Sequence, residues 1–478
     1  MRKPFSSQQR LDCNSVVDVP LNLECRDEII PILRALQHIY AKPGLRDEIL
    51  RLIADDVNKD ARDDCGRDGL DYWQILVLAA VRLGCNLDYD KLQDLAEQHR
   101  ALRHVMGVGD WDGDSTFSWR RIRDNLCLVR PATIDKISHA IVAEGHRLQP
   151  DAAKQARADS FVVETNIHYP SESSLIRDGL RKIIEQCVQL ADGAGAGWRQ
   201  HEHLLKKIKK LSRQIERIAS RKGPNYEERI KKPYRELLRL AKKTLTRARA
   251  LAAARDPAAV AELSQFIERT EQVCGTARRR VLQGETVPNS DKLFSIFEPH
   301  TQLYKRGKAG EPIQFGRLLL VYEDAAGFIT HHHVLPRDAA DRDVVVEQTR
   351  IVQQRLGGKI KEASFDRGFH TPENQTQLGT IIAHPCLPKL GKQGQKQAQS
   401  SVRFRRACQR HPGIESAIGA LQAGNGLERC RDRSELGFDR FVSLGVLGRN
   451  LQVLGKLLIA REASRSEAAR SLRQRTAA

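Results

Sequence analysis

The spacing of apolar residues changes along the chain from a helical period to a strand-like one at about residue 291. Residues 15–150 follow the helical period, and residues 69–84 are apolar almost all round, which is typical of a central helix in a small bundle. Asp88 can cap the next helix, which the pattern extends through residue 104. We therefore expect an all-helical N-terminal domain over residues 1–150.

Residues 199–285 form a second helical segment of a different kind. Its apolar positions follow a 4-3-4-3 spacing, and a Gly-Pro-Asn sequence at 223–225 interrupts the helix. The members of this seam are Leu204, Ile208, Leu211, Ile215 and Ile218. The window 201–250 holds 17 lysines and arginines against 5 glutamates, a net charge of +12. The pattern predicts a basic, coiled-coil-like helical hairpin whose seam is buried against itself or against a partner subunit; the alternative is an ordinary antiparallel pair with a solvated basic exterior.

The region after residue 291 predicts strands that alternate with helices. Apolar runs at 317–322 and 328–335 flank a short polar turn, which indicates a β-hairpin. Further on, the sequence predicts a helix from Asp341 or Asp343 to about 356, a strand at 359–366, a helix from Pro372 and an apolar stretch at 381–387. With the apolar run after Asp159, these elements define an α/β domain over residues 151–198 and 286–460.

The composition points to a polyanionic partner. The chain of 478 residues carries 79 lysines and arginines against 60 aspartates and glutamates, a net charge of +19. Such an excess favours nucleic acid, because each neutralised phosphate releases a condensed counterion. An acidic membrane is the rival partner, but the longest purely apolar run, residues 75–81, is far shorter than the roughly 20 residues that span a bilayer.

The ends of the chain and its cysteines restrict the class of protein further. The first residues, MRKPFSSQQRLDCN, lack the apolar region of a secretory signal, so we expect a cytoplasmic, nucleoid-associated protein. The ten cysteines include no CxxC pair, and we expect them to be reduced and mostly buried. Residues 461–478, rich in arginine, serine and alanine, are expected to be a flexible basic tail.

Three carboxylates have positions that suit a metal site. Asp159 stands at the head of the apolar run SFVVET, Asp366 closes ASFD, and Glu415 lies beside an apolar helical face in the first turn of a predicted helix. Carboxylate oxygens at two strand ends and on a helix can converge, and such hard ligands bind Mg²⁺ or Mn²⁺. Taken singly, each of the chain's acidic residues is more simply a surface group.

The selection of these three comes from a resemblance to a known family. The segments DSFVVETNIHYPSESS (159–174), FDRGFHTPEN (365–374) and GIESAIGAL (413–421) resemble the three catalytic blocks of bacterial insertion-sequence DDE transposases, of the ISNCY type. Residues 69–96 resemble the N-terminal helical domain of the same group. The order of the three blocks carries the resemblance, since any one alone is a modest signal.

The resemblance implies an RNase H-like catalytic core, with the first aspartate on the first strand, the second on the fourth and the glutamate on a later helix. It assigns catalysis and metal binding to Asp159, Asp366 and Glu415, with two Mg²⁺ or Mn²⁺ ions. The fold class is then α/β, with an all-α N-terminal domain and the basic hairpin inserted in the core. The implied activity is cleavage of double-stranded DNA at the inverted repeats of the element and transfer of the new 3′-OH to target DNA, by a homodimer or a higher oligomer.

The sequence departs from the family pattern around the glutamate. Arg410 is near the place of a family arginine, whereas Cys408 stands roughly where related enzymes carry tyrosine and Gln422 where they carry lysine. Glu428 and Glu435 are therefore fallback candidates for the third ligand. A catalytically silent DNA-binding regulator or decayed transposase, and an RNase H-like nuclease without strand transfer, remain the alternative functions.

Several basic and histidine residues are candidates for DNA contacts. The candidate arginines are Arg120, Arg121 and Arg123 beside Trp119, then Arg367, Arg405, Arg406 and Arg410. A solvated basic surface is the alternative for each of them. His331, His332 and His333 are expected to face solvent or, for one of them, a phosphate, because successive strand residues alternate faces and cannot all bind one ion. Asn166 and His168 are candidates for a DNA contact or for a turn.

Overall fold

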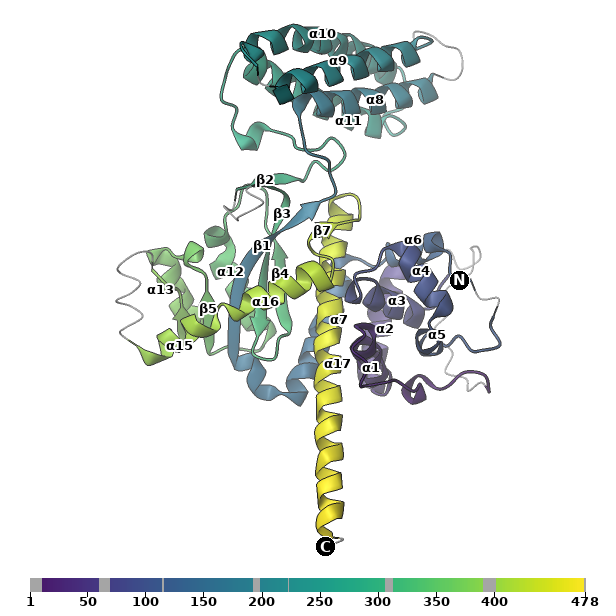
Figure 1. The fold of residues 1–478 in the computed structure, drawn as a ribbon, viewed down its shortest axis with the longest axis vertical. Coiled ribbons are helices and arrows are strands. Elements are labelled where there is room, and N and C mark those ends of the chain that lie inside the picture. Colours follow the sequence, from purple (N-terminus) through teal and green to yellow (C-terminus); the bar gives the residue numbers. More distant parts are fainter. Residues whose placement is uncertain are drawn as a thin grey trace. The chain divides into compact units, whose positions relative to one another are not determined.

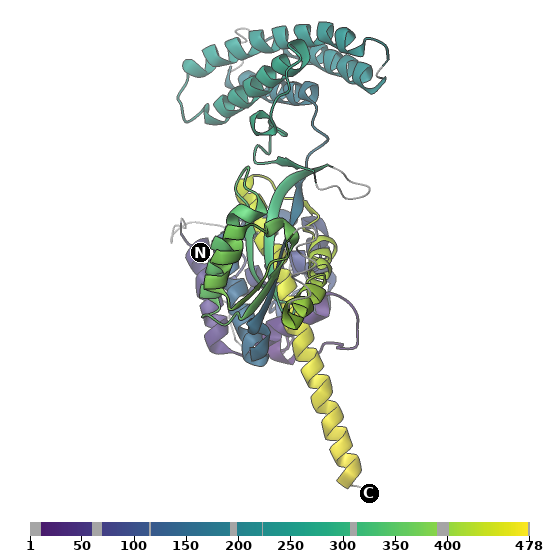
Figure 2. The same ribbon diagram turned by 90° about the vertical axis from the view of Figure 1, so that its left-hand side faces the viewer.

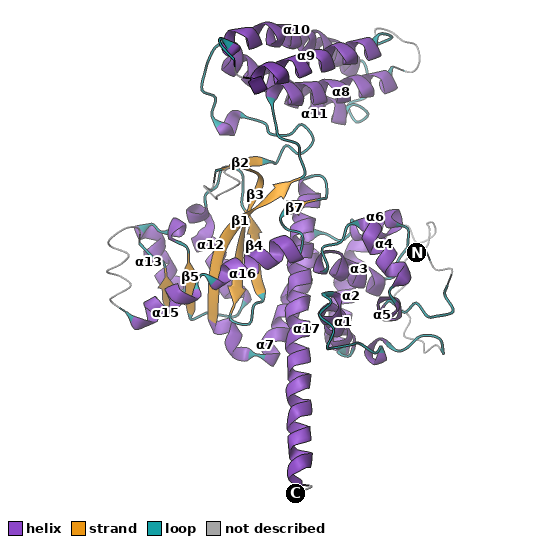
Figure 3. Ribbon diagram, viewed as in Figure 1, coloured by secondary structure: helices purple, strands orange, loops and turns teal. Residues whose placement is uncertain are grey.

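A computed structural model describes residues 11–59, 69–113, 116–191, 198–221, 223–305, 313–389 and 401–476 (Figure 1). By contacts among its residues, the chain divides into two compact units, Met1–Glu164 with Leu318–Ala478 and Thr165–Arg317. The fold is mixed α/β, and Figure 3 shows the strands of the chain as a single group among many helices. Each unit is described by itself.

The first unit combines the N-terminal helices with most of the sheet and the C-terminal helix. Its helices are α1 (Ile29–Tyr40), α2 (Pro43–Val57), α3 (Tyr72–Gly84), α4 (Tyr89–Gln98), α5 (Arg100–Val105), α6 (Trp119–Leu126), α7 (Pro131–Leu148), α12 (Asp341–Arg355), α13 (Pro372–Ile381), α15 (Val402–Arg410), α16 (Gly413–Gly419) and α17 (Glu435–Thr476). Helix α3 begins with a capping box in which the Asp71 side chain accepts from the Gln74 N–H. Asp88 caps α4 as predicted, but His99 ends that helix and caps α5.

The described strands form one seven-stranded mixed sheet. They are β1 (Gln155–Thr165), β2 (Gln302–Tyr304), β3 (Gln314–Asp324), β4 (Ile329–Val334), β5 (Glu362–Phe365), β6 (His384–Cys386) and β7 (Arg429–Cys430). The order is β2-β3-β1-β5-β6, with β4 also paired to β3 and β7 to β1. Strands β3 and β4 are antiparallel, which confirms the predicted hairpin, whereas β1, β5 and β6 run parallel.

The two faces of the sheet are covered by different helices, and the alternation along β3 shows how. Tyr322 points to α12, where its hydroxyl donates to Val345 O at 3.3 Å and lies 2.8 Å from Thr349 Oγ1. The alternate residues Leu319 and Val321 join the hydrophobic core that includes the N-terminal helices and α17. Figure 2 shows α12 and α17 on opposite sides of the sheet. Because successive residues of β3 face opposite sides of the sheet, one side of the strand packs against α12 and the other against the core that includes α17.

The N-terminal helices do not form a domain of their own, unlike the expectation for residues 1–150. Trp73, Ile134, Phe161 and Leu447, from α3, α7, β1 and α17, are buried in one continuous core. Helices α3 and α17 cross so closely that a Cβ on Gly448 would lie 2.6 Å from the backbone nitrogen of Gly84. The apolar period of a helix predicts which face is buried, but it does not predict which other element covers that face. The sequence therefore could not predict this shared core.

Helix α17 includes most of the predicted flexible tail, because residues 461–476 are helical, while residues 477 and 478 lie outside the described residues. It is also the one helix of the described residues, over Glu435–Ala468, that is long and apolar enough to cross a membrane. Of its most apolar 18-residue window, 72% is buried inside the protein. Such burial is typical of the core helix of a soluble protein.

The second unit is a four-helix bundle larger than the predicted hairpin. Helices α8 (Glu172–Leu190), α9 (His201–Arg221), α10 (Tyr226–Ala253) and α11 (Ala261–Ala277) enclose their own hydrophobic core (Figure 1). Ile208, Leu211 and Ile215 of the predicted seam are buried in it. The seam is therefore buried against other helices of the same unit. One of these is α8, which the sequence analysis had assigned to the catalytic domain.

Candidate active site

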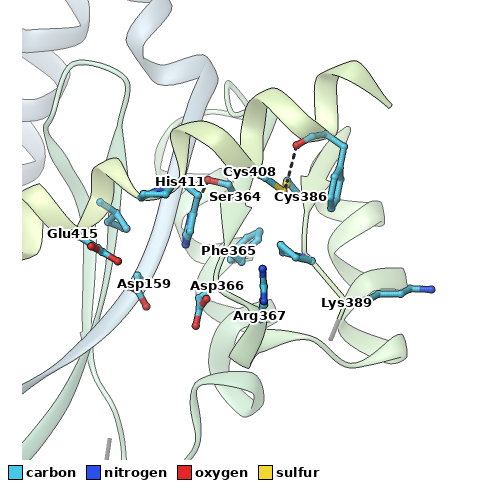
Figure 4. A pocket seen from close by; sticks show the side chains of 14 residues that line it. Asp159, Ser364, Phe365, Asp366, Arg367, Cys386, Lys389, Cys408, His411 and Glu415 are labelled. Carbon is cyan, nitrogen blue, oxygen red and sulfur yellow. Dashed lines mark hydrogen bonds between the residues drawn. The ribbon is translucent and has the colours of Figure 1, made fainter. Parts of the chain in front are cut away.

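One cavity of the first unit, of about 620 Å³, brings the three predicted carboxylates together. It is lined by Asp159, Ser364, Phe365, Asp366, Arg367, Cys386, Pro388, Lys389, Phe404, Cys408, His411, Pro412, Ile414 and Glu415. Figure 4 shows Asp159 between Glu415 and Asp366, with the three carboxylate groups turned to the same side. Residues separated by more than 200 positions in the sequence thus share one wall of one cavity.

The register of the parallel strands explains why the two aspartates are neighbours. Ala158 of β1 pairs with Phe365 of β5, so the next residue on each strand is Asp159 and Asp366 respectively. Strand β5 ends at Phe365, and Asp366 precedes a 3-10 turn over Arg367–Phe369. Parallel strands with this register place both side chains at the carboxyl end of β5, where active sites of open α/β sheets form.

The position of Asp159 within its strand differs from the prediction. The sequence placed it at the head of a strand, whereas β1 begins four residues earlier, at Gln155. Ala156 and Ala158 are buried and alternate with half-buried residues, a pattern too weak to predict a strand from small side chains. The opening in front of Asp159 arises because its neighbour β5 stops, not because β1 starts.

Glu415 is supplied by the first turn of α16. Ile414, Ala417 and Ile418 of this helix are buried, and Glu415 is exposed towards the cavity. The fallback residues Glu428 and Glu435 do not line the cavity: Glu428 lies in a turn just before β7, and Glu435 begins α17. Of the three candidates, Glu415 alone lies with the aspartates.

The donor set fits a magnesium ion by its chemistry. Carboxylate oxygens are the ligands of Mg²⁺, which keeps several waters and is often held by only one or two carboxylates together with substrate phosphate. In the described part of the chain, no group of three or more histidine, cysteine, aspartate or glutamate side chains is close enough to hold one ion as it stands. The register of β1 and β5 makes Asp159 and Asp366 neighbours that could share an ion, and Glu415 lies on the other side of Asp159 from Asp366 (Figure 4).

The cavity also contains a histidine that the sequence analysis did not select. His411 Nδ1 lies 3.1 Å from Ser364 Oγ. Burial lowers the pKa of His411, and the neighbouring Asp366 and Glu415 carboxylates oppose that shift. This shift favours the neutral imidazole. The available signal was its place four residues before Glu415, in the short link between α15 and α16.

The arginines of α15 fall into two groups. Arg410 and Arg403 both bind the Glu362 carboxylate, which is 10% exposed, with Arg403 Nε donating at 2.9 Å. Arg405 and Arg406 are exposed, as is Arg367 beside Asp366. Arg410 thus has a structural partner, whereas Arg405 and Arg406 are oriented to solvent.

The predicted basic group on α6 is similarly divided. Arg121 is half-buried and its guanidinium donates to Gly69 O at 3.2 Å. Arg120 and Arg123 are exposed and lie over the Trp119 ring at 5.0 and 5.2 Å from its centroid. Both are thus at the surface, although Arg123 Nη2 also donates to Asp124 Oδ1 at 2.8 Å, and Arg121 links α6 to the segment just before α3.

The expectation that His331, His332 and His333 face solvent is wrong for the first two. His331 is 5% exposed and its Nε2 lies 2.8 Å from Gln348 Oε1 of α12. His332 Nε2 lies 3.3 Å from Ser443 Oγ of α17. The alternation of the strand was predicted correctly, but helices cover β4 on both faces. In the second unit, His168 Nε2 lies 3.4 Å from Asp178 Oδ2 of α8.

The chain was also compared with known proteins. It matches no protein-family model, no curated protein and no solved structure. The function is therefore inferred from the cavity, its carboxylates and the sequence motifs.

Proposed function

We propose that the chain is a metal-dependent enzyme that cleaves and joins DNA phosphodiester bonds. More particularly, we propose an insertion-sequence DDE transposase of the ISNCY type, acting on the terminal inverted repeats of its element. The observation that carries this proposal is that Asp159, Asp366 and Glu415, selected from three separate sequence blocks, line one cavity.

The topology of the sheet supports an RNase H-like core. With the three-residue strand β2 set aside, β5 is the fourth strand in chain order, and it is followed directly by Asp366. Asp159 is on the first strand, β1, and Glu415 is on the later helix α16. This is the arrangement that the family resemblance implies, with α8–α11 inserted after the first strand.

The chemistry follows from what these side chains can hold. Two Mg²⁺ ions bound by the three carboxylates would activate the attacking oxygen and stabilise the leaving oxygen of an in-line displacement. The chain's own contribution is a rigid support: Asp159 is fixed by the buried strand β1, and Glu415 by the buried face of α16. Arg367, which lines the same cavity next to Asp366, supplies positive charge beside the carboxylates for a DNA phosphate, and Lys389 lines the cavity farther from them (Figure 4).

The basic surfaces of both units suit a DNA partner. In the second unit the outward positions of α9 and α10 carry exposed lysines and arginines, among them Lys209, Arg213, Arg235 and Lys242. Like charges gathered on one bundle repel one another, and a polyanion bound to them relieves that repulsion. Two element ends have to be brought together, so we expect a homodimer or a higher oligomer on DNA.

A nicking and joining assay tests this proposal. The full chain is incubated with duplex DNA taken from the flanks of its own reading frame, with Mg²⁺ or with EDTA, and then with a target plasmid. We expect a Mg²⁺-dependent break that leaves a 3′-OH, followed by a joined product. Cleavage without joining would instead identify a nuclease, and binding without cleavage a regulator.

The arginines of α15 give a separate test of the DNA-binding face. The double change Arg405→Ala and Arg406→Ala is expected to weaken DNA binding for all sequences alike and to reduce the slope of log K against log salt by about 2, since each phosphate contact contributes roughly 0.9. Fluorescence anisotropy over a salt series measures this slope.

Arg410→Ala is the matched control for that test, because the Arg410 guanidinium binds Glu362. It should lower stability and leave the salt slope unchanged. An unchanged slope in the Arg405 and Arg406 double variant would remove α15 from the DNA-binding face.

A further inference from the structure

Two cysteines lie in contact in the wall of the candidate active site. Cys386 Sγ of β6 and Cys408 Sγ of α15 are 3.4 Å apart, and both residues line the cavity that holds the three carboxylates. The thiol of Cys386 also lies 3.7 Å from Phe404 O. Nothing in the catalytic proposal uses either thiol.

The two thiols differ in their access to solvent. Cys386 is 3% exposed, and burial, followed by the neighbouring Cys408 thiol, raises the pKa of its own thiol. Cys408 is half-buried and borders the cavity, so a small molecule in the cavity reaches Cys408 first. An accessible cysteine with a buried neighbour at contact distance is the arrangement of an attacking and a resolving thiol.

We propose that Cys386 and Cys408 form a reversible disulfide that switches the candidate active site off, with a low-molecular-weight disulfide as the oxidant. The Cys408 thiolate attacks one sulfur of the oxidant, which forms a mixed disulfide and releases one small thiol. The Cys386 sulfur then attacks the Cys408 sulfur and displaces the second small thiol. Two protein thiols are oxidised, one small disulfide is reduced, and the two thiol protons leave with the two small thiols.

The proposed effect of the disulfide on the candidate active site depends on the distance between the Cys386 and Cys408 sulfurs. A disulfide needs its sulfurs about 2.05 Å apart, so the contact of 3.4 Å has to shorten, and the new bond then ties α15 covalently to β6. Cys408 is followed closely by His411 and Glu415, which line the same cavity. Oxidation therefore constrains the wall of the cavity that leads to the third carboxylate, Glu415. Cytoplasmic disulfides are usually of this transient, regulatory kind.

The test begins with a readout that is independent of catalysis. The full chain is treated with oxidised glutathione, free thiols are alkylated, and peptides are mapped by mass spectrometry without reduction. We expect a peptide pair linked through Cys386 and Cys408 in the native chain and in Cys127→Ala, a control that removes an exposed cysteine. Cys386→Ala and Cys408→Ala should lack it. Finding both cysteines alkylated while exposed Cys25 carries glutathione would overturn the proposal.

The predicted effect of the disulfide on DNA cleavage rests on the proposed function. The experiment distinguishes a failure of the switch from a failure of the proposed function. The oxidised chain should cut element-end DNA at least 10-fold more slowly, and dithiothreitol should restore the rate, in the native chain and in Cys127→Ala only. If the disulfide forms and the rate is unchanged, the switch is refuted. If the reduced chain does not cut at all, the DNA-cleavage proposal fails, and the mapped disulfide still stands as a modification site.

Discussion

Replacing Asp366 by Asn is expected to abolish the proposed Mg²⁺-dependent cleavage of element-end DNA, and so are Asp159→Asn and Glu415→Gln. Each change keeps the shape of the side chain and removes one negative ligand. Loss of a group that merely orients a metal ligand costs about 10–100-fold, so we expect a fall of more than about 100-fold when a ligand itself is lost. Binding of the same DNA, measured by anisotropy, should remain within about 2-fold, since most protein–DNA affinity comes from phosphate contacts by basic residues.

Matched controls separate a catalytic role from a general loss of acidic charge. Glu428→Gln and Glu435→Gln remove carboxylates that flank the same region but do not line the cavity, and they should cleave at the native rate. A Glu415→Gln chain that still cleaves, together with an inactive Glu428→Gln or Glu435→Gln chain, would move the third ligand away from α16. Normal cleavage by either aspartate variant would refute the proposed site.

The site could be predicted from the sequence to the extent that it depends on residue type and order. The strand before Asp366, the hairpin β3–β4 and the helix carrying Glu415 each have a clear apolar period. The adjacent positions of Asp159 and Asp366 could not be predicted from either strand alone, because they depend on the register between β1 and β5. His411, Cys386 and Cys408 were also missed as site residues, since their chemistry appears only when α15 lies beside β6.

The fold was predicted least well where one element is covered by a distant one. The buried residues among the first four of β1 are two alanines, which carry little strand signal. The sequence pattern of His331 is that of a surface residue, but α12 and α17 cover β4 on both faces. The length of α17 was missed for the opposite reason: after residue 461 its sequence has little apolar periodicity, although the helix continues. A segment can be helical without burying one face, and the apolar period of a sequence indicates mainly the buried face.

The buried ion pair between Arg82 and Asp432, which no sequence motif indicated, is expected to contribute strongly to the free energy of unfolding. Arg82 of α3 is 1% exposed, and its Nη1 and Nη2 donate to Asp432 Oδ2 and Oδ1 at 2.9 and 2.5 Å. The guanidinium also lies over the Tyr89 ring, 3.9 Å from its centroid. Arg82→Met leaves the Asp432 carboxylate without this partner in a setting where its side chain is only 11% exposed. We expect a loss of about 3–5 kcal/mol in the free energy of unfolding.

Urea unfolding followed by tryptophan fluorescence measures this loss. Trp198 belongs to the second unit, so a Trp198→Phe background makes the signal report on Trp73, Trp111 and Trp119 of the first unit. Arg123→Met, which breaks an exposed pair with Asp124, is the control and should change stability by no more than about 0.5 kcal/mol. The double variant Arg82→Met and Asp432→Leu should lose far less than the sum of the single changes, because replacing a whole buried pair by apolar residues is often neutral.

Asp432 of the Arg82–Asp432 pair lies close in the sequence to the helix that carries Glu415, so loss of the pair bears on the proposed active site. Asp432 lies between α16, which carries Glu415, and α17, and the same segment is held to the end of α3 by Asn425 Nδ2 donating to Leu83 O at 3.0 Å. If breaking the Arg82 contact lowers the unfolding free energy of the whole first unit in one transition, the N-terminal helices support the segment that carries Glu415 and cannot be removed as an independent domain. A separate early transition, with Trp73 exposed and cleavage retained, would show that they fold on their own.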